Sequence, residues 1–399
     1  MITKQEYRER MEKLRTKVQE KGIDAYLVSA EESIYYLTGA TYVPLERPFF
    51  IIVWPDRDPT LLVPALEEEH MRRAPYAGKV ISYWDYPSPP GEGWQDRLHE
   101  IIEKASTIGV EPSLPREISD EIEEKNPETI PFIEELRLVK SPAEIGMLRR
   151  AGKYSDLGVG KILSAAYYGI SELEVFSQGK AVQMQILKDI YYDALSTDVM
   201  CMSWVAPDSA QPHSIPTVYD RLKDGPHIIY SNMRVNGYTT ECERTWFLSE
   251  PDDEVRRAFA VMTEARRRAF EMVRPGVECA EIDRTANGFL REEGYGDNLL
   301  HRTGHGLGLG SHEGPWISDG SADILKENMV ISIEPGIYIQ GTGGIRHSDT
   351  VLVTGDGYEL LTNYPTDLES MIVKQRKTLK RLKGAIIRKA VRLDRYQPG

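Results

Sequence analysis

The sequence predicts a mixed α/β protein with a small N-terminal part and a larger C-terminal part. Helical and strand patterns alternate up to about Pro131, which is typical of a small α/β domain. From Pro142 onward, long helical stretches alternate with strands and hairpins that carry most of the conspicuous histidines and glutamates. With 399 residues, 41% of them hydrophobic and 28% charged, the chain is long enough for two cores.

The N-terminal part opens with a charged amphipathic pattern, which predicts a helix over about Lys4–Lys21. A strand over AYLVS follows, and then a pair of strands near FFIIVW and TLLVP. In the C-terminal part, we expect long helices over residues 142–163, 171–189 and 253–273.

Two hairpins lie among these helices. HIIYSNMRVNGYTTECERTWFL reads as two strands that turn near Asn236-Gly237. Glu241 and Glu243 are two residues apart on the second strand, so they share one face, and Cys242 should point away from them.

The second hairpin follows further along the chain. NMVISIEPGIYI alternates like a half-buried strand and carries Glu334. After a Gly-Thr-Gly-Gly turn signal, IRHSDTVLVT returns with Arg346 and Asp349.

The charge of the chain is unevenly placed. Residues 374–399 carry ten Lys or Arg against one Asp, a charge of +9. Since the net charge of the whole chain is −13, the preceding residues carry −22. We therefore expect no nucleic-acid partner for the body of the protein. The tail itself could bind RNA, an anionic membrane or the acidic body of its own oligomer, or be disordered.

Cysteine usage and hydropathy indicate the compartment. The three cysteines, Cys201, Cys242 and Cys279, have no paired spacing, which fits a reducing environment. The sequence contains neither a signal-peptide pattern nor an apolar run of about eighteen residues. We expect a cytoplasmic protein without a membrane span.

A glycine-rich segment, HRTGHGLGLGSHEGP, holds three histidines. His301, His305 and His312 lie among glycines that let the backbone approach a ligand closely. Imidazoles in such a loop bind metal or move protons, although His301 could equally hydrogen-bond a strand end.

HRTGHGLGLGSHEGP, ISIEPGIYI and GYTTECERT together resemble the creatinase/prolidase family, the pita-bread hydrolases, which include Xaa-Pro peptidases. The resemblance covers residues 1–373. It implies a C-terminal pita-bread domain, which is a curved antiparallel sheet backed by helices, and a join near Arg137–Ser141. We accordingly expect domains over residues 1–136 and 142–373, followed by a basic tail over 374–399.

In the metallopeptidases of that family, five side chains hold two metal ions. The matching positions in this sequence are Tyr230, Glu241, His305, Glu334 and Ser348. Two of these residues replace carboxylates, and a two-metal site needs anionic oxygen ligands. We therefore expect no di-metal centre and no cofactor, with a single ion at Glu241, His305 and Glu334 as the alternative.

The site pattern resembles creatinase, the member of the family that works without metal. That resemblance implies that His213 is the general acid and base, and that Glu243 and Glu334 hold a planar cationic group. Arg47, in an Arg-Pro-aromatic step, would reach into the partner subunit and bind the substrate carboxylate, which implies a homodimer.

The remaining residues that we expect to contact the substrate are His305, His312, Tyr230, Glu241 and Arg346. The sequence thus predicts a creatinase-like hydrolase that cleaves a non-peptide C–N bond in a small zwitterionic guanidino, amidine or cyclic amidine compound. Glu241 and the segment Glu313-Gly314-Pro315 depart from creatinase and resemble the peptidases. Two alternatives remain open: an Xaa-Pro dipeptidase or aminopeptidase with an atypical metal site, and an inactive member that serves as a binding module.

Overall fold

A computed structural model describes residues 2–85, 87–373, 378–390 and 392 of the chain. The chain forms two compact units, Met1–Arg137 and Leu138–Gly399, and the mixed α/β class is confirmed. The finer division into residues 1–136, 142–373 and 374–399 stays a prediction. Residues 374–377, 391 and 393–399 of the expected tail lie outside the described part.

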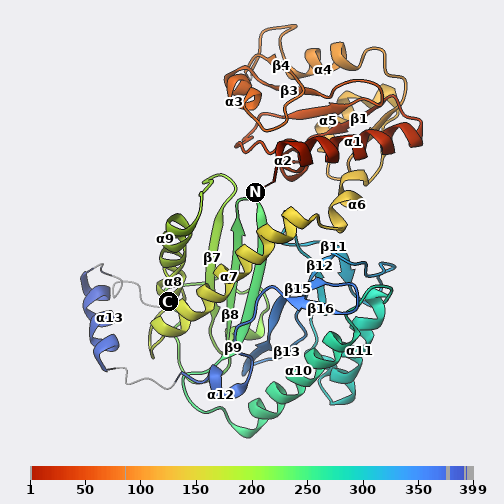
Figure 1. Ribbon diagram of the computed structural model, residues 1–399. Coiled ribbons are helices and arrows are strands. Elements are labelled where there is room, and N and C mark those ends of the chain that lie inside the picture. The colour runs from red at the N-terminus through yellow and green to blue at the C-terminus, as the bar shows by residue number, and fades with distance from the viewer. Residues whose placement is uncertain (1, 86, 374–377, 391, 393–399) are drawn as a thin grey trace. The chain divides into compact units, whose positions relative to one another are not determined.

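The first unit is built on a six-stranded mixed sheet (Figure 1). In spatial order its strands are β4 (Lys79–Tyr83), β3 (Thr60–Pro64), β2 (Phe50–Val53), β1 (Ala25–Val28), β5 (Ile108–Val110) and β6 (Glu128–Thr129). Its helices are α1 (Lys4–Lys21), α2 (Glu31–Thr38), α3 (Glu68–Arg72), α4 (Trp94–Ile102), α5 (Arg116–Glu121) and α6 (Phe132–Leu138).

Local signals explain where α1 begins and ends. The hydroxyl of Thr3 accepts a hydrogen bond from the backbone N–H of Glu6, and Gly22 ends the helix in the left-handed conformation with φ 74°. The predicted bounds of this helix, Lys4–Lys21, are confirmed.

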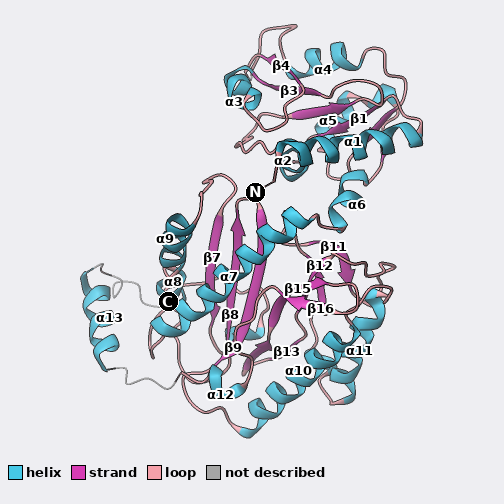
Figure 2. Cartoon of the chain, viewed as in Figure 1, coloured by secondary structure: helices cyan, strands magenta, loops and turns pink. Residues whose placement is uncertain are grey.

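The second unit is built on an eight-stranded sheet whose pairs are antiparallel (Figure 2). Along the sheet lie β11 (Glu313–Ile317), β10 (Gly304–Gly306), β12 (Val330–Ile333), β15 (Ser348–Val353), β9 (Tyr238–Trp246), β8 (His227–Val235) and β7 (Asp198–Trp204), and β16 (Tyr358–Leu360) pairs with β15. A separate two-stranded sheet joins β13 (Gly336–Ile339) to β14 (Gly343–Arg346).

The described part of the second unit also contains seven α-helices. They are α7 (Pro142–Ala165), α8 (Glu172–Phe176), α9 (Gly179–Asp189), α10 (Asp253–Met272), α11 (Cys279–Glu292), α12 (Leu368–Met371) and α13 (Thr378–Ala390). The long helix α7 crosses β8 and β9, and a Ser141–Glu144 capping box with Pro142 at the first turn fixes its start (Figure 1). Helices α10 and α11 pack on each other and on β12 and β15.

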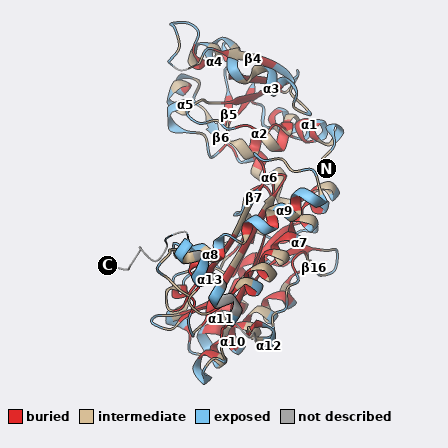
Figure 3. Cartoon of the chain, turned by 90° about the vertical axis from the view of Figure 1, so that its left-hand side faces the viewer, coloured by how far each residue is buried: buried red, intermediate tan, exposed pale blue. Residues whose placement is uncertain are grey.

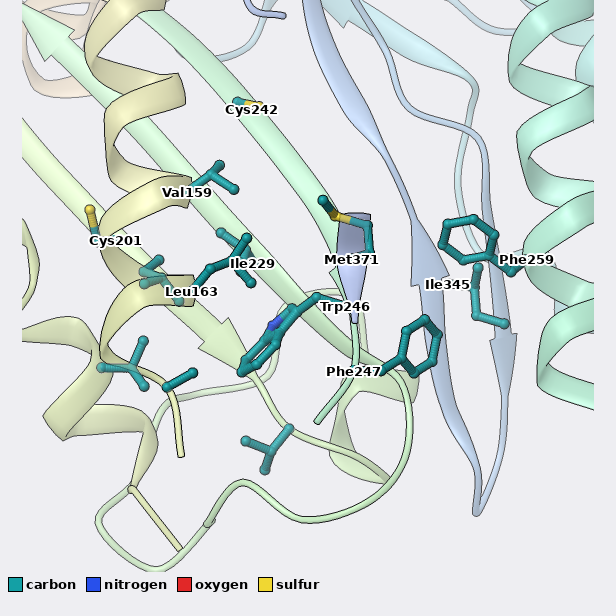
Figure 4. Packing of buried hydrophobic residues seen from close by; sticks show 14 of the residues in the cluster. Val159, Leu163, Cys201, Ile229, Cys242, Trp246, Phe247, Phe259, Ile345 and Met371 are labelled. Atoms are coloured by element: carbon teal, nitrogen blue, oxygen red, sulfur yellow. The ribbon is translucent and has the colours of Figure 1, made fainter. Parts of the chain in front are cut away.

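The main core of the second unit lies between α7 and the face of β9 that turns away from the site. Trp246 and Cys242 point into this core together with Val159 and Leu163 of α7 (Figure 4). All nine residues of β9 are buried, and buried residues gather on the strands of the sheet (Figure 3). Cys242 therefore points away from the two glutamates, as its alternation with them predicted.

The β8–β9 hairpin turns at the predicted pair. Asn236 and Gly237 both have positive φ, 47° and 91°, which is typical of the tight hairpin turns that match strand twist. The register that follows places Tyr230 opposite Glu243 and Asn232 opposite Glu241. Residues of one face of this hairpin thus form one wall of the site.

Three expected elements are interrupted in the structure. The strand expected over IRHSDTVLVT divides into β14 and β15 at His347. The strand expected over NMVISIEPGIYI divides into β12 and β13 at Glu334-Pro335, because proline lacks the N–H that a sheet requires. The helix expected over 171–189 divides into α8 and α9 near Ser177 and Gln178. The interruption at Glu334-Pro335 lies at the cavity, which the Glu334 side chain lines.

Among the described residues, no helix is both long enough and apolar enough to cross a membrane.

Candidate active site

The second unit contains an open cavity of about 650 Å³ that brings most of the predicted site residues together. Its wall includes Tyr230, Glu241, Glu243, Glu334 and Arg346 from the sheets, and His213, His301 and His312 from loops. One side is apolar, because β7 presents Met200, Met202 and Trp204 to the cavity at alternate positions. The cavity therefore combines an acidic floor with an apolar wall.

The acidic floor centres on His305. Its Nε2 atom lies 3.2 Å from Glu334 Oε1 and 3.6 Å from Glu241 Oε1. Burial alone would lower the pKa of the His305 imidazole, but Glu241 and Glu334 outweigh burial and raise this pKa to about 9. Burial likewise opposes ionisation of Glu334, yet His305 holds the Glu334 pKa well below its usual range.

These residues form a group of potential metal ligands. Ligand atoms of Glu241, His305 and His312 lie within 4.8 Å of one another, and the rings of the two histidines are 3.9 Å apart. His305 Nε2 is buried and lacks a hydrogen bond of good geometry, so a buried polar atom is left unsatisfied. The residues present fit one divalent ion held by His305 and by the carboxylates of Glu241 and Glu334.

The two positions that the family resemblance links to further ligands offer no carboxylate. Ser348 donates a hydrogen bond to Glu241 Oε1 at 2.9 Å, so it supports a ligand. Tyr230 stacks on Trp204, with ring centres 5.6 Å apart, and burial beside Glu241 raises its pKa. The residues present therefore do not fit a pair of carboxylate-bridged ions.

Glu243 is paired inside the protein. Arg346 Nη2 donates to Glu243 Oε1 at 2.6 Å, and Arg346 Nε lies 2.5 Å from Glu243 Oε2. Arg346 also donates to the Tyr338 hydroxyl at 2.9 Å, which lies 2.6 Å from His301 Nε2. A substrate cation would have to compete with Arg346 for the Glu243 carboxylate.

His213 lies exposed in the loop that follows β7. The buried carboxylate of Glu172 holds this loop at both ends, because it accepts hydrogen bonds from the backbone N–H groups of Val205 and Thr217, each at 2.9 Å. Trp204 Nε1 also donates to the carbonyl of Ser214 at 2.5 Å. His213 thus sits on a tethered segment at the rim of the cavity.

Arg47 belongs to the first unit, where Arg47 Nε donates to Asp85 Oδ1 at 2.6 Å. Its guanidinium also lies 3.3 Å from Glu46. Its expected role in the site of a partner subunit stays a prediction.

Comparison with known proteins identifies the family of both units. Residues 146–355 match Metallopeptidase family M24, and residues 10–139 match the Creatinase/Prolidase N-terminal domain. The chain belongs to metallopeptidase family M24. This membership supports an enzyme of the hydrolase class with a pita-bread domain.

Relatives of family M24 extend over nearly the whole chain. An Xaa-Pro dipeptidase of Lactobacillus delbrueckii subsp. lactis is 30% identical over 92% of this chain and 100% of its own. A putative dipeptidase of Bacillus subtilis is 31% identical over 90% and 99%. The prolidase structure from Pyrococcus horikoshii OT3 has a TM-score of 0.78 and 28% identity, over 90% of this chain and 99% of its own.

Two predictions are wrong in view of these findings. The relatives are dipeptidases and prolidases, so they contradict the creatinase-like hydrolase of guanidino, amidine or cyclic amidine compounds. The physical reason is that Glu243, expected to hold such a cation, is already neutralised by Arg346. The expectation of no cofactor is wrong as well, since a metallopeptidase family matches and the remaining ligands converge on His305.

Sequence reasoning missed several residues that build the site. Met200 and Met202 were not predicted to line it, and neither Glu172 nor Arg302 was singled out. The alternation of Met200, Met202 and Trp204 in DVMCMSW was a usable strand signal. Nothing comparable marks Glu172, because its role depends on contacts with residues 33 and 45 positions away.

Proposed function

We propose that the protein is a metal-dependent peptidase that cleaves short peptides at the bond before proline, as an Xaa-Pro dipeptidase does. The observation that carries the proposal is the convergence of the Glu241 and Glu334 carboxylates on one unsatisfied imidazole nitrogen, His305 Nε2. That convergence occurs in a chain whose relatives are named Xaa-Pro dipeptidase and prolidase.

One ion per chain is the stoichiometry that the residues support. His305, Glu241 and Glu334 would hold it, with His312 close enough to exchange into the set. A divalent ion there supplies Lewis-acid polarisation of the scissile carbonyl. Ser348 keeps Glu241 oriented through its hydrogen bond. His305 Nδ1 lies 3.0 Å from the carbonyl oxygen of Gly306, and this contact orients the imidazole ring.

The chain's own residues would handle the proton. The proline nitrogen must gain a proton when the peptide bond breaks, and a histidine at the rim of the cavity is suited to deliver it. His213 lines the cavity on the segment tethered by Glu172. The apolar side chains of Met200 and Met202 would contact the residue before proline and exclude water from it.

The test compares chelated protein with protein reloaded with Mn²⁺, Co²⁺ or Zn²⁺, on Xaa-Pro dipeptides and on Xaa-Ala dipeptides as controls. We expect about one ion per chain by mass spectrometry, and hydrolysis of the proline peptides that is lost on chelation. Glu334→Gln should lose both ion and turnover, whereas the matched exposed variant Glu327→Gln should keep both.

Two results would overturn the proposal. Turnover that persists without a bound ion would remove the metal from the reaction. Protein that binds an ion and proline peptides without cleaving them would favour an inactive binding module, a reading that Tyr230 and Ser348 support. A homodimer and a cytoplasmic location are proposed with the same function and are tested by light scattering and by fractionation.

A further inference from the structure

The cavity contains an arginine that no carboxylate of the described residues neutralises. Two arginines line the wall, Arg346 and Arg302. Arg346 contacts both carboxylate oxygens of Glu243 through its Nε and Nη2 atoms. Within the described part of the chain, Arg302 has no ion pair with any Asp or Glu, although it lies in a cavity that three glutamates also line.

The Arg302 side chain is nonetheless held in place. Its Nε donates to the carbonyl of Gly304 at 3.1 Å, and its guanidinium carbon lies 4.8 Å from the centre of the Trp316 ring. Its Nη2 lies 3.5 Å from His312 Nδ1, a long contact that leaves most of its donor capacity unused. One edge of the guanidinium is fixed by the protein, and the other edge is free to meet a ligand in the cavity.

We propose that Arg302 binds the carboxylate of the substrate. A guanidinium presents paired N–H donors that match the two oxygens of a carboxylate. Arg302 lies beside the potential metal ligand His312, so a carboxylate bound to Arg302 would lie close to the group of potential metal ligands. This inference rests on the proposed function and narrows it to peptides whose free carboxylate follows the scissile bond closely.

With Arg302 in this role, the substrate carboxylate does not require Arg47 of a partner subunit. Arg47 is engaged with Asp85 in its own unit, whereas Arg302 already lines the cavity of the unit that holds the acidic cluster. Blocking the substrate carboxylate as an amide would leave Arg302 without an anion. Dipeptide amides and longer peptides should therefore be poor ligands.

The experiment compares Ala-Pro with Ala-Pro amide in wild type, Arg302→Gln and Arg302→Lys, with Arg274→Gln as an exposed arginine control outside the cavity. We expect wild type and the control to prefer the free acid by about 10- to 100-fold in KM. Arg302→Gln should lose this preference, with KM for the amide almost unchanged, and Arg302→Lys should keep part of it. An equal loss for both substrates, or an unchanged preference, overturns the proposal.

A binding measurement separates this proposal from the proposed function. In chelated protein, calorimetry with L-proline and with L-prolinamide reports carboxylate binding without any turnover. Proline that binds wild type and the control at least tenfold more tightly than it binds Arg302→Gln supports the role of Arg302, even if no peptide is cleaved. Proline that binds wild type and Arg302→Gln equally, or binds neither, overturns the role of Arg302 even in an active peptidase.

Discussion

The buried ion cluster behind the site gives the most direct stability prediction. Asp349 is fully buried and pairs with two arginines: Arg244 Nη2 lies 2.8 Å from one carboxylate oxygen, and Arg266 contacts the other. We consider Asp349→Asn, which keeps the size of the side chain and removes its charge. Both guanidinium groups then lose their only carboxylate in the described part of the chain.

The structure sets the size of the effect. Removing one partner of a buried ion pair typically costs about 3–5 kcal/mol. Arg244 keeps carbonyl acceptors from Tyr364, Pro365 and Ser348, and the partly accessible Arg266 can turn toward water, so the lower end applies. A loss of about 3 kcal/mol corresponds to a drop in Tm of about 6–12 °C for a unit of this size.

Urea denaturation and calorimetry at pH 7 measure this loss. The matched control is Asp356→Asn, the same substitution at an exposed turn seven residues further on, which should change the free energy of unfolding by less than about 0.5 kcal/mol. If Asp349→Asn lowered the free energy of unfolding by no more than the Asp356→Asn control, about 0.5 kcal/mol, the ion cluster would not stabilise the sheet.

Three further predictions concern the elements that position the site. Burial raises the pKa of Glu172 to about 7. Its protonated form therefore stabilises the folded state fully below pH 4.5, and this stabilisation is lost as the pH rises through 7. Glu172→Gln should make the urea midpoint less dependent on pH between these values. A Cβ on Gly306 would lie 1.9 Å from the carbonyl oxygen of Gly314, so Gly306→Ala should displace His305. We expect metal content and turnover to fall by about 100-fold, and unchanged metal content would contradict this reasoning. Asn236→Ala places alanine at φ 47° in the hairpin turn and removes the hydrogen bonds of the Asn236 amide, so it should lower the free energy of unfolding by about 1–3 kcal/mol in urea denaturation. An unaltered urea midpoint would show that the turn does not need asparagine at this position.

Local patterns in the sequence predicted the elements that carry the site. Alternation on β9 placed Glu241 and Glu243 on one face, and the Asn236-Gly237 pair located the turn. These predictions succeed because strand periodicity and turn chemistry depend on neighbouring residues. The interruption at Glu334-Pro335 was within reach too, since proline in a central strand signals a break.

Contacts between distant segments were out of reach. Nothing in the spacing of residues shows that Arg346 neutralises Glu243, 103 positions away, or that Arg302 has no carboxylate partner among the described residues. The functional prediction failed at this level. It gave more weight to the replaced residues Tyr230 and Ser348 than to a single ion at Glu241, His305 and Glu334, and spacing does not show how closely the two carboxylates approach His305 Nε2. The identity of single residues does not show which charges are paired around a cavity that distant segments form together.

The β8–β9 hairpin has a consequence for how this site can change over generations. Its register is set by the turn at Asn236-Gly237, several residues along each strand from Tyr230 and Glu243. Exchanges at positions 230, 241 and 243 therefore alter the wall of the cavity without shifting the strands that present it. The register of the sheet and the chemistry of the cavity wall are therefore set by different residues of one hairpin, so the wall can change in evolution while the strand pairing stays the same.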